Sequence, residues 1–73
     1  MEHKVIELLY LRSQMFFHSY RRQVYIDLDD FQMAMYNHFM FLDLAEQFGA
    51  IKNSMTKKES QQYMLAMLCW DYK

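Results

Sequence analysis

The sequence predicts an all-α fold, either a small three-helix bundle or a helical hairpin that dimerisation completes. The 73 residues include no proline and one glycine, so little interrupts a helix. Apolar residues recur at helical spacing over three segments, and two of these segments begin with capping residues. Linkers at about 25–29 and 49–55 join the segments. Because connections this short make consecutive helices antiparallel neighbours, we expect one domain covering residues 1–73.

The first predicted helix covers about residues 2–24. Placed at 100° steps around a helix, its large apolar residues fall on one broad arc and its charged residues on the opposite side. The arc contains Val5, Ile6, Leu9, Tyr10, Phe16, Phe17, Tyr20 and Val24. Arg21 and Arg22 stand near the carboxyl end, where positive charge complements the helix dipole. The pattern indicates an amphipathic helix with a wide apolar face.

The second predicted helix covers about residues 30–48 and is apolar on every side. Asp29 is the expected N-cap, with Gln32 three residues further on as in a capping box. Gly49 is expected just past the carboxyl end, where glycine commonly stands. A helix without a polar face is normally enclosed. We therefore expect this helix to be covered on one side by its own chain and on another by a partner.

The third predicted helix covers about residues 57–71. Thr56 and Glu59 form a T-x-x-E capping box at its start. Its first turns are polar, whereas the run from Tyr63 to Trp70 is apolar on all sides. We expect this apolar half to pack against other structure on more than one side.

The apolar content exceeds what so short a chain can bury by itself. Eight methionines and an aromatic content of 18% supply the excess, whereas a domain of this size buries only about 60–65% of its unfolded surface. Cys69 is the single cysteine and cannot form an internal disulfide. We therefore expect a homodimer, a complex with a larger protein, or both. The predicted interface consists of aromatic residues and methionines from the last two helices: Phe39, Met40, Phe41, Tyr63, Met67 and Trp70.

Methionine allows two interpretations in this chain. Its flexible side chain suits surfaces that repack against different partners, and it also fills gaps in cores. The methionines that could line a binding groove on the last two helices are Met33, Met35, Met40, Met64 and Met67.

Side chains that could support catalysis or hold a metal form no recognisable motif. The acidic cluster at Asp27–Asp30 lacks the glycine and glutamate of a calcium loop, since Gln32 and His38 occupy those positions. Cys69 lies in an apolar run, which predicts a buried and unreactive thiol. We therefore expect no enzymatic activity, no cofactor, no metal and no small-molecule substrate.

The charge balance argues against general nucleic-acid binding. The net charge is −1 and the pI about 6.2, without the basic surface of such proteins. Four residues remain candidates for contact with nucleic acid: Arg21, Arg22, Lys57 and Lys58. The sequence shows no apolar run long enough to cross a membrane and no signal peptide, and a lone cysteine suits a reducing compartment. We expect a cytoplasmic protein.

The segment from Leu44 to Gly49 resembles the middle of a helix-turn-helix DNA-binding motif. Ala45 stands four residues before the turn glycine, and the apolar Met55 stands six residues after it. The pattern departs from the family at Lys58, where an apolar residue belongs. The resemblance implies a dimer that reads a symmetric DNA site.

These features predict a small regulatory protein that acts by binding another protein, as an inhibitor, an adaptor or a chaperone. An aromatic and methionine-rich helical surface would make the contact. The size of the chain also suits a phage- or plasmid-encoded inhibitor of a host protein. The alternative is a dimeric, helix-turn-helix-like transcriptional regulator that binds DNA.

Overall fold

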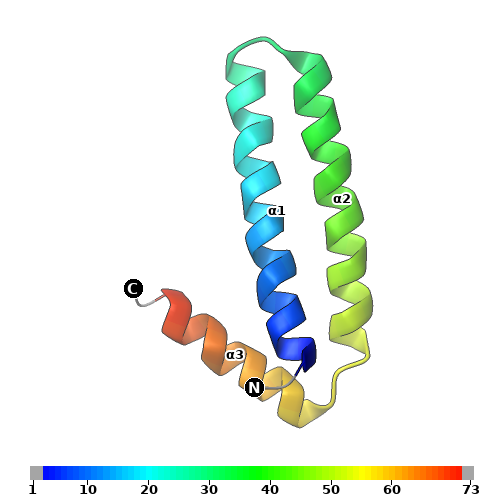
Figure 1. Cartoon of the computed structure of the whole chain (residues 1–73), viewed down its shortest axis with the longest axis vertical. Coiled ribbons are helices and arrows are strands. Elements are labelled where there is room, and N and C mark those ends of the chain that lie inside the picture. The colour runs from blue at the N-terminus through cyan, green and yellow to red at the C-terminus, as the bar shows by residue number, and fades with distance from the viewer. Residues whose placement is uncertain (1–2, 72–73) are drawn as a thin grey trace.

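The computed structural model describes residues 3–71, with the side chains of residues 3–69. It contains three helices, α1 (His3–Asp27), α2 (Phe31–Asn53) and α3 (Lys57–Asp71), and no strand within this range. Helices α1 and α2 form an antiparallel hairpin, and α3 crosses the end of the hairpin where α1 begins and α2 ends (Figure 1). The predicted all-α class is confirmed.

The turn between α1 and α2 uses its two adjacent aspartates for different tasks. Asp29 has a φ of 60° and ends α1, with its N–H donating to Ile26 O at 3.0 Å and Asp30 N–H donating to Tyr25 O at 2.9 Å. These two bonds define a Schellman motif, in which the left-handed residue is usually glycine or asparagine. Asp30 caps α2 by accepting a hydrogen bond from Met33 N at 3.2 Å. The prediction that Asp29 caps the second helix is wrong by one residue, and α1 continues past its predicted end at residue 24.

Gly49 does not end the second helix. Helix α2 continues to Asn53, and Ser54 closes it with its backbone N–H and its hydroxyl both directed at Ile51 O. The predicted end at residue 48 is wrong because the residues after the glycine gain burial by remaining helical. Ile51 packs against the core, and this offsets the cost of about 1 kcal/mol of a glycine inside a helix.

The predicted capping box of α3 is confirmed. Glu59 N–H donates to Thr56 Oγ1 at 3.2 Å, and Thr56 N–H donates to Glu59 Oε1 at 2.9 Å. Two backbone donors that the helix itself cannot satisfy are thus paired. The bounds of α3 agree with the prediction.

The core lies where the three helices meet. Val5 and Leu8 of α1 and Tyr63 of α3 are its buried centre. Partly buried side chains from all three helices and the α2–α3 connection pack around them: Leu9, Phe48, Ile51, Met55, Ala66 and Met67. This cluster holds α3 against the start of α1.

Helix α1 turns a different face inward from the one that its apolar arc indicated. The buried residues are Val5, Leu8 and Leu11, while most large residues of the arc face solvent. The exposed members are Ile6, Tyr10, Phe16, Phe17 and Tyr20. On the side of α1 expected to be polar, His18 bonds to Asn37 and Arg22 to His38, both on α2. The contact between α1 and α2 is therefore partly polar.

The other two helices are also covered on one side only within the described part of the chain. Helix α2 leaves Phe31, Met35, Tyr36, Phe39 and Leu42 exposed, and α3 leaves Met64, Leu65 and Leu68 exposed. The apolar half of α3 extends beyond the hairpin (Figure 1), and Cys69 within it is exposed. The prediction that Cys69 is buried is wrong, because it does not lie on the side of α3 that packs against α1.

Candidate protein-binding surface

An apolar groove lies at the junction of the three helices. Its volume is about 300 Å³, and most of its lining is aromatic or thioether. The lining residues are Arg12, Met15, Phe16 and Ser19 from α1, Phe41 and Phe48 from α2, and Tyr63 from α3. We call this space the three-helix groove. Large, adaptable apolar side chains with few polar groups are typical of the centre of a protein interface.

Tyr63 forms the floor shared by this groove and a second hollow. It is buried, and its ring meets Phe48 edge to face, with 6.0 Å between the ring centroids and 68° between the ring planes. The second hollow, of about 140 Å³, lies between the end of α2 and α3, where its remaining lining residues are Lys52, Met55, Ser60, Met64 and Met67. Two apolar recesses thus meet at Tyr63.

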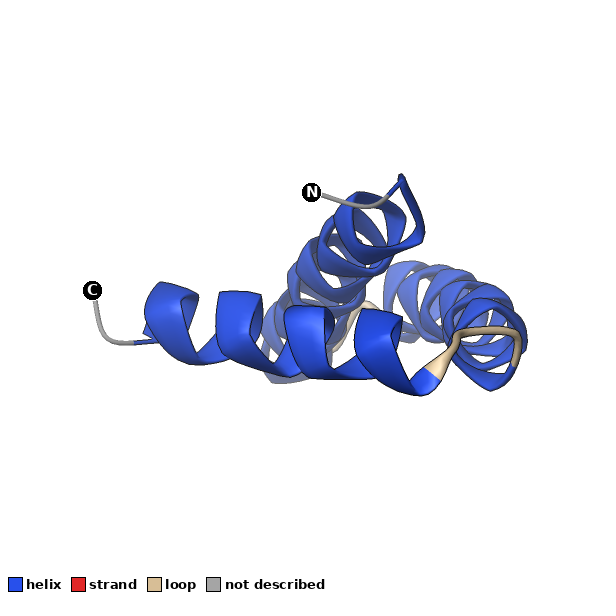
Figure 2. Cartoon of the chain, turned by 90° about the horizontal axis from the view of Figure 1, so that it is seen from below, coloured by secondary structure: helices blue, strands red, loops and turns tan. Residues whose placement is uncertain are grey.

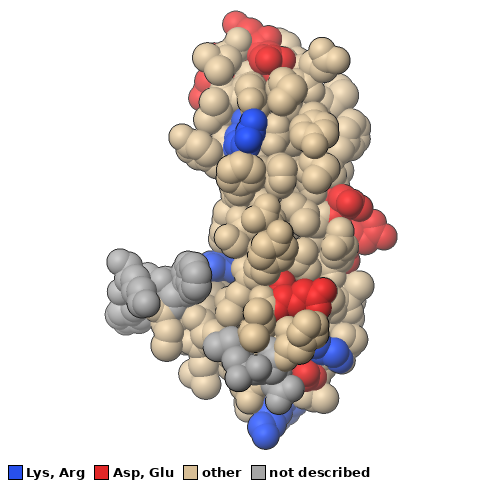
Figure 3. Space-filling view, viewed as in Figure 1, with Lys and Arg blue, Asp and Glu red and all other residues tan. Residues whose placement is uncertain are grey.

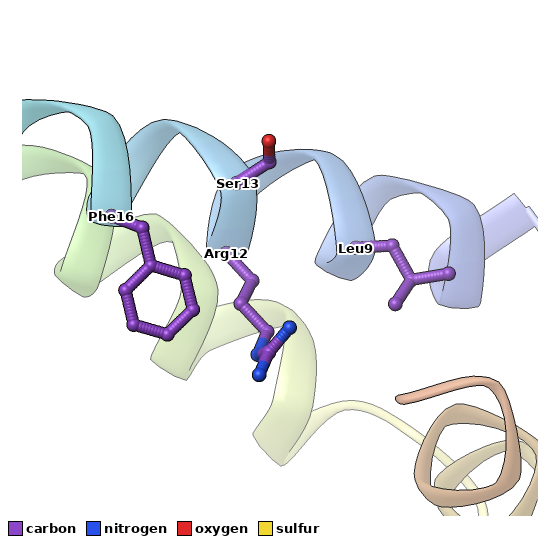
Figure 4. Close-up of a pocket in the computed structure, with 4 residues that line it drawn as sticks. All are labelled: Leu9, Arg12, Ser13 and Phe16. Atoms are coloured by element: carbon purple, nitrogen blue, oxygen red, sulfur yellow. The ribbon is translucent and has the colours of Figure 1, made fainter. Parts of the chain in front are cut away.

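Arg12 and Phe16 form one rim of the three-helix groove. They lie one turn apart on α1 and project to the same side, with the guanidinium carbon 4.8 Å from the centroid of the phenyl ring (Figure 4). The same two residues line a smaller hollow of about 110 Å³ with Leu9 and Ser13. The cation–π contact holds a positive charge beside an exposed aromatic ring.

The structure brings together only some of the six predicted interface residues. Phe41 and Tyr63 line the three-helix groove, and Met67 lines the second hollow. Met40 is half-buried, and Phe39 is exposed on a part of α2 that does not line the groove. The side chain of Trp70 lies outside the described residues. Sequence reasoning missed the contributions of α1 to the groove, although Phe16 belongs to its apolar arc.

The methionines do not form one continuous groove. Met64 and Met67 line the second hollow together with Met55. Met33 and Met35 lie in the first turns of α2, at the end of the hairpin that α3 does not reach (Figure 1). Of the two interpretations of methionine, the one in which Met33 and Met35 share a groove with the methionines of α3 therefore does not hold, because α3 crosses the opposite end of α2.

Arg21 and Arg22 both contact other side chains of this chain. The Arg21 guanidinium lies 5.3 Å from the Phe17 ring centroid and 5.6 Å from that of Tyr25, and it donates to the Tyr25 hydroxyl at 2.9 Å. Arg22 donates to His38 Nδ1 at 2.8 Å and lies 5.8 Å from the centroid of another ring, that of Phe41.

The two basic pairs do not form one surface. Lys57 and Lys58 are exposed at the start of α3, which packs near Val5 and Leu8. Arg21 lies 13 residues beyond Leu8, or roughly 20 Å along the helix at 1.5 Å per residue. On the face shown in Figure 3, lysine and arginine occupy separate spots and most of the surface is uncharged.

The turn required by the helix-turn-helix resemblance is not formed. Gly49, the residue at the turn position, lies inside α2 and has no positive φ. The chain turns only after Asn53, and the second helix of the pattern cannot follow at the expected spacing. Within residues 3–71 the resemblance therefore lacks its structural basis.

The titratable groups of the described residues include one with a shifted pKa, Glu59. No three histidine, cysteine, aspartate or glutamate side chains among them lie close enough to share a metal ion. The backbone N–H of Thr56, which donates to the Glu59 carboxylate, lowers the pKa of that group, and its hydroxyl and the charge of Lys4 act in the same direction. This shift belongs to a helix cap.

No family model, curated protein or solved structure matches this chain. Across the described range, none of the helices combines the length and the apolar character needed to span a membrane.

Proposed function

We propose that this chain is a small, non-enzymatic regulatory protein that acts by binding another protein through the three-helix groove. The observation that carries the proposal is that side chains from all three helices converge on one apolar groove beside the buried Tyr63. Exposed apolar groups that adjoin a recess mark interaction sites more often than scattered ones do. Regulation would follow from covering a surface of the partner, as an inhibitor, an adaptor or a chaperone does.

The chemistry of the groove suits an amphipathic helix as the bound element. Phe16, Phe41 and Phe48 offer ring surfaces on which apolar side chains at i, i+3 and i+4 of such a helix can pack. Arg12 and Ser19 supply a charged group and a hydroxyl at the same groove. Met15 can adjust its side chain to the shape of the inserted residue. The proposal places the protein in the cytoplasm, where its lone cysteine would stay reduced.

Site-specific photo-crosslinking in the native cell tests the proposal. A photoreactive amino acid is introduced at Ser19, inside the groove, and for comparison at Gln47, which is exposed on α2. We expect one discrete cross-linked protein from position 19 and none from position 47. That partner is then purified and its affinity for the full chain measured.

A matched pair of variants makes the test specific. Phe16 and Phe39 are exposed to almost the same extent, at 59% and 60%, but only Phe16 lines the groove. Phe16→Ala should weaken partner binding at least tenfold, because interface aromatics contribute about 2 kcal/mol or more, and Phe39→Ala should leave it unchanged. The solution mass of each variant is measured alongside to separate partner binding from self-association. Equal cross-linking from both positions, or an effect of Phe39→Ala alone, would contradict the groove assignment.

A further inference from the structure

A row of residues, exposed from Ile6 to Tyr20 and half-buried at Val24, runs along the side of α1 that faces away from α2. Its members are spaced alternately by four and three residues: Ile6, Tyr10, Ser13, Phe17, Tyr20 and Val24. We call it the outer row. The exposed fractions of its largest side chains are high, at 53% for Ile6, 62% for Tyr10, 48% for Phe17 and 71% for Tyr20. Alternating steps of four and three are the spacing of a coiled-coil seam.

The described part of the chain leaves most of this row uncovered. Seen along the hairpin, α2 lies to one side of α1 and α3 crosses beneath it (Figure 2). Leu8 and Leu11 face the interior, and the groove residues Arg12 and Ser19 face a third side. From Ile6 to Val24 the outer row spans 18 residue steps, roughly 27 Å at 1.5 Å per residue, which is long enough for a helix–helix contact.

We propose that a second copy of this chain packs antiparallel along the outer row, so that the protein is a homodimer joined through its α1 helices. Antiparallel pairing centred between Ser13 and Phe17 places these two residues opposite each other across the interface. The small serine of one copy then faces the large phenylalanine of the other, so these two side chains fill the space between the helices without a clash. The same register sets Tyr10 opposite Tyr20 of the second copy, and Ile6 opposite the second copy's Val24.

Charge complementarity selects this direction. Glu7 and Arg21 lie on the same flank of the outer row, 14 residues and therefore two heptads apart. In the antiparallel register each Glu7 faces the second copy's Arg21, which gives two symmetric ion pairs. In a parallel pair the two residues would remain at opposite ends of the seam, roughly 21 Å apart. The contacts of Arg21 with Phe17 and Tyr25 already hold its guanidinium beside the row, and its remaining N–H groups are sufficient for a carboxylate.

The inference does not rest on the proposed function, because the outer row and the three-helix groove lie on different sides of α1. A dimer would leave the groove available for a further protein. Loss of self-association with an intact cross-link at Ser19 would refute only the dimer. Loss of the cross-link in a chain that still dimerises would refute only the proposed function.

Charge reversal in the full chain tests the interface and its direction. Light scattering over a concentration series should give twice the 9.1 kDa of the chain. Glu7→Arg or Arg21→Glu alone should weaken the dimer about tenfold, since each sets two pairs of like charges face to face. The double variant Glu7→Arg/Arg21→Glu should restore the dimer to within about threefold of the original, because the pairs are re-formed with reversed sign. Glu46→Arg, on the exposed side of α2, is the control and should have no effect.

A second pair of variants tests the face itself. Phe17→Glu places a carboxylate in the seam and should give a monomer with an unchanged helical circular dichroism spectrum. Phe39→Glu introduces the same change at an exposed position of α2 and should remain dimeric. A monomer at every concentration of the unmodified chain would overturn the proposal, as would a dimer that only Phe39→Glu disrupts. A double charge variant no better than the single ones would overturn the antiparallel direction.

Discussion

His18 and Asn37 join α1 to α2 through a hydrogen bond between two side chains. The Asn37 amide nitrogen donates to Met33 O at 2.8 Å, so the amide oxygen faces His18 and accepts a hydrogen bond from its Nδ1–H at 2.9 Å. Asn37 is only 1% exposed. A buried polar residue in a helix–helix contact permits one register and penalises the others, because sliding the helices would leave its groups unpaired. We infer that this pair fixes the alignment of the hairpin.

Replacing Asn37 should therefore lower the free energy of unfolding by more than the loss of a few side-chain atoms would. Asn37→Ala leaves the His18 donor without its partner, and we expect the free energy of unfolding to fall by about 1–3 kcal/mol. A double-mutant cycle with His18→Ala, measured by urea denaturation, should give a coupling energy of about 1 kcal/mol. Additive effects of the two substitutions would show that the hydrogen bond does not contribute to stability.

Helix-forming segments and one local cap could be predicted from the sequence, because they depend on neighbouring residues. The Thr56–Glu59 capping box and the bounds of α3 are of this kind. The end of α2 could not be predicted, since it depends on the packing of Ile51 against residues distant in sequence. The sequence could not show that Asp30, rather than Asp29, caps α2, because this depends on the left-handed backbone conformation of Asp29 in the turn.

The inward face of α1 and the candidate groove were harder to predict, because both depend on how the helices pack against one another. Periodicity assigns most weight to large aromatic residues, but α1 buries Val5, Leu8 and Leu11. Phe41 and Tyr63 were predicted as interface residues and do line the groove. Its other walls follow from the angle at which α3 crosses the hairpin, which no local pattern encodes.

Replacing Gly49 should stabilise the protein. Gly49 is helical and has no positive φ, and a Cβ added there would meet no atom within 4 Å apart from its chain neighbours and the backbone of its own helix. Gly49→Ala removes the conformational freedom of glycine in the unfolded chain, and we expect a gain of about 0.5–1 kcal/mol. Thermal unfolding measures it, with the neighbouring Ala50→Gly as the control that should lose a similar amount. A loss of stability in Gly49→Ala would mean that α2 does not continue through this position.

Identical substitutions at two leucines test where the core lies. Leu8 is fully buried among the three helices, whereas Leu65 on α3 is 64% exposed. Leu8→Ala should reduce the free energy of unfolding by about 2–5 kcal/mol, because it removes buried methyl groups and leaves a cavity. Leu65→Ala should change the stability of the isolated chain by about 0.5 kcal/mol or less. Comparable losses from both variants, measured by denaturant unfolding, would mean that α3 buries a different face.

Stability should also depend on the ionisation of Glu59. The backbone N–H of Thr56, the Thr56 hydroxyl and the charge of Lys4 favour the carboxylate, so the pKa of Glu59 in the folded chain lies below its ordinary value of 4.5. A group whose pKa is lowered by folding stabilises the folded state above its unfolded pKa, and the contribution disappears as the pH falls through the folded pKa. Glu59→Gln keeps an oxygen that can accept the Thr56 N–H but removes the charge. We therefore expect the unmodified chain to be more stable than Glu59→Gln near neutral pH, with the difference shrinking as the pH falls below 4.5. Urea unfolding of both chains across this pH range measures the difference, and a difference independent of pH would show that the charge of Glu59 does not contribute to the cap.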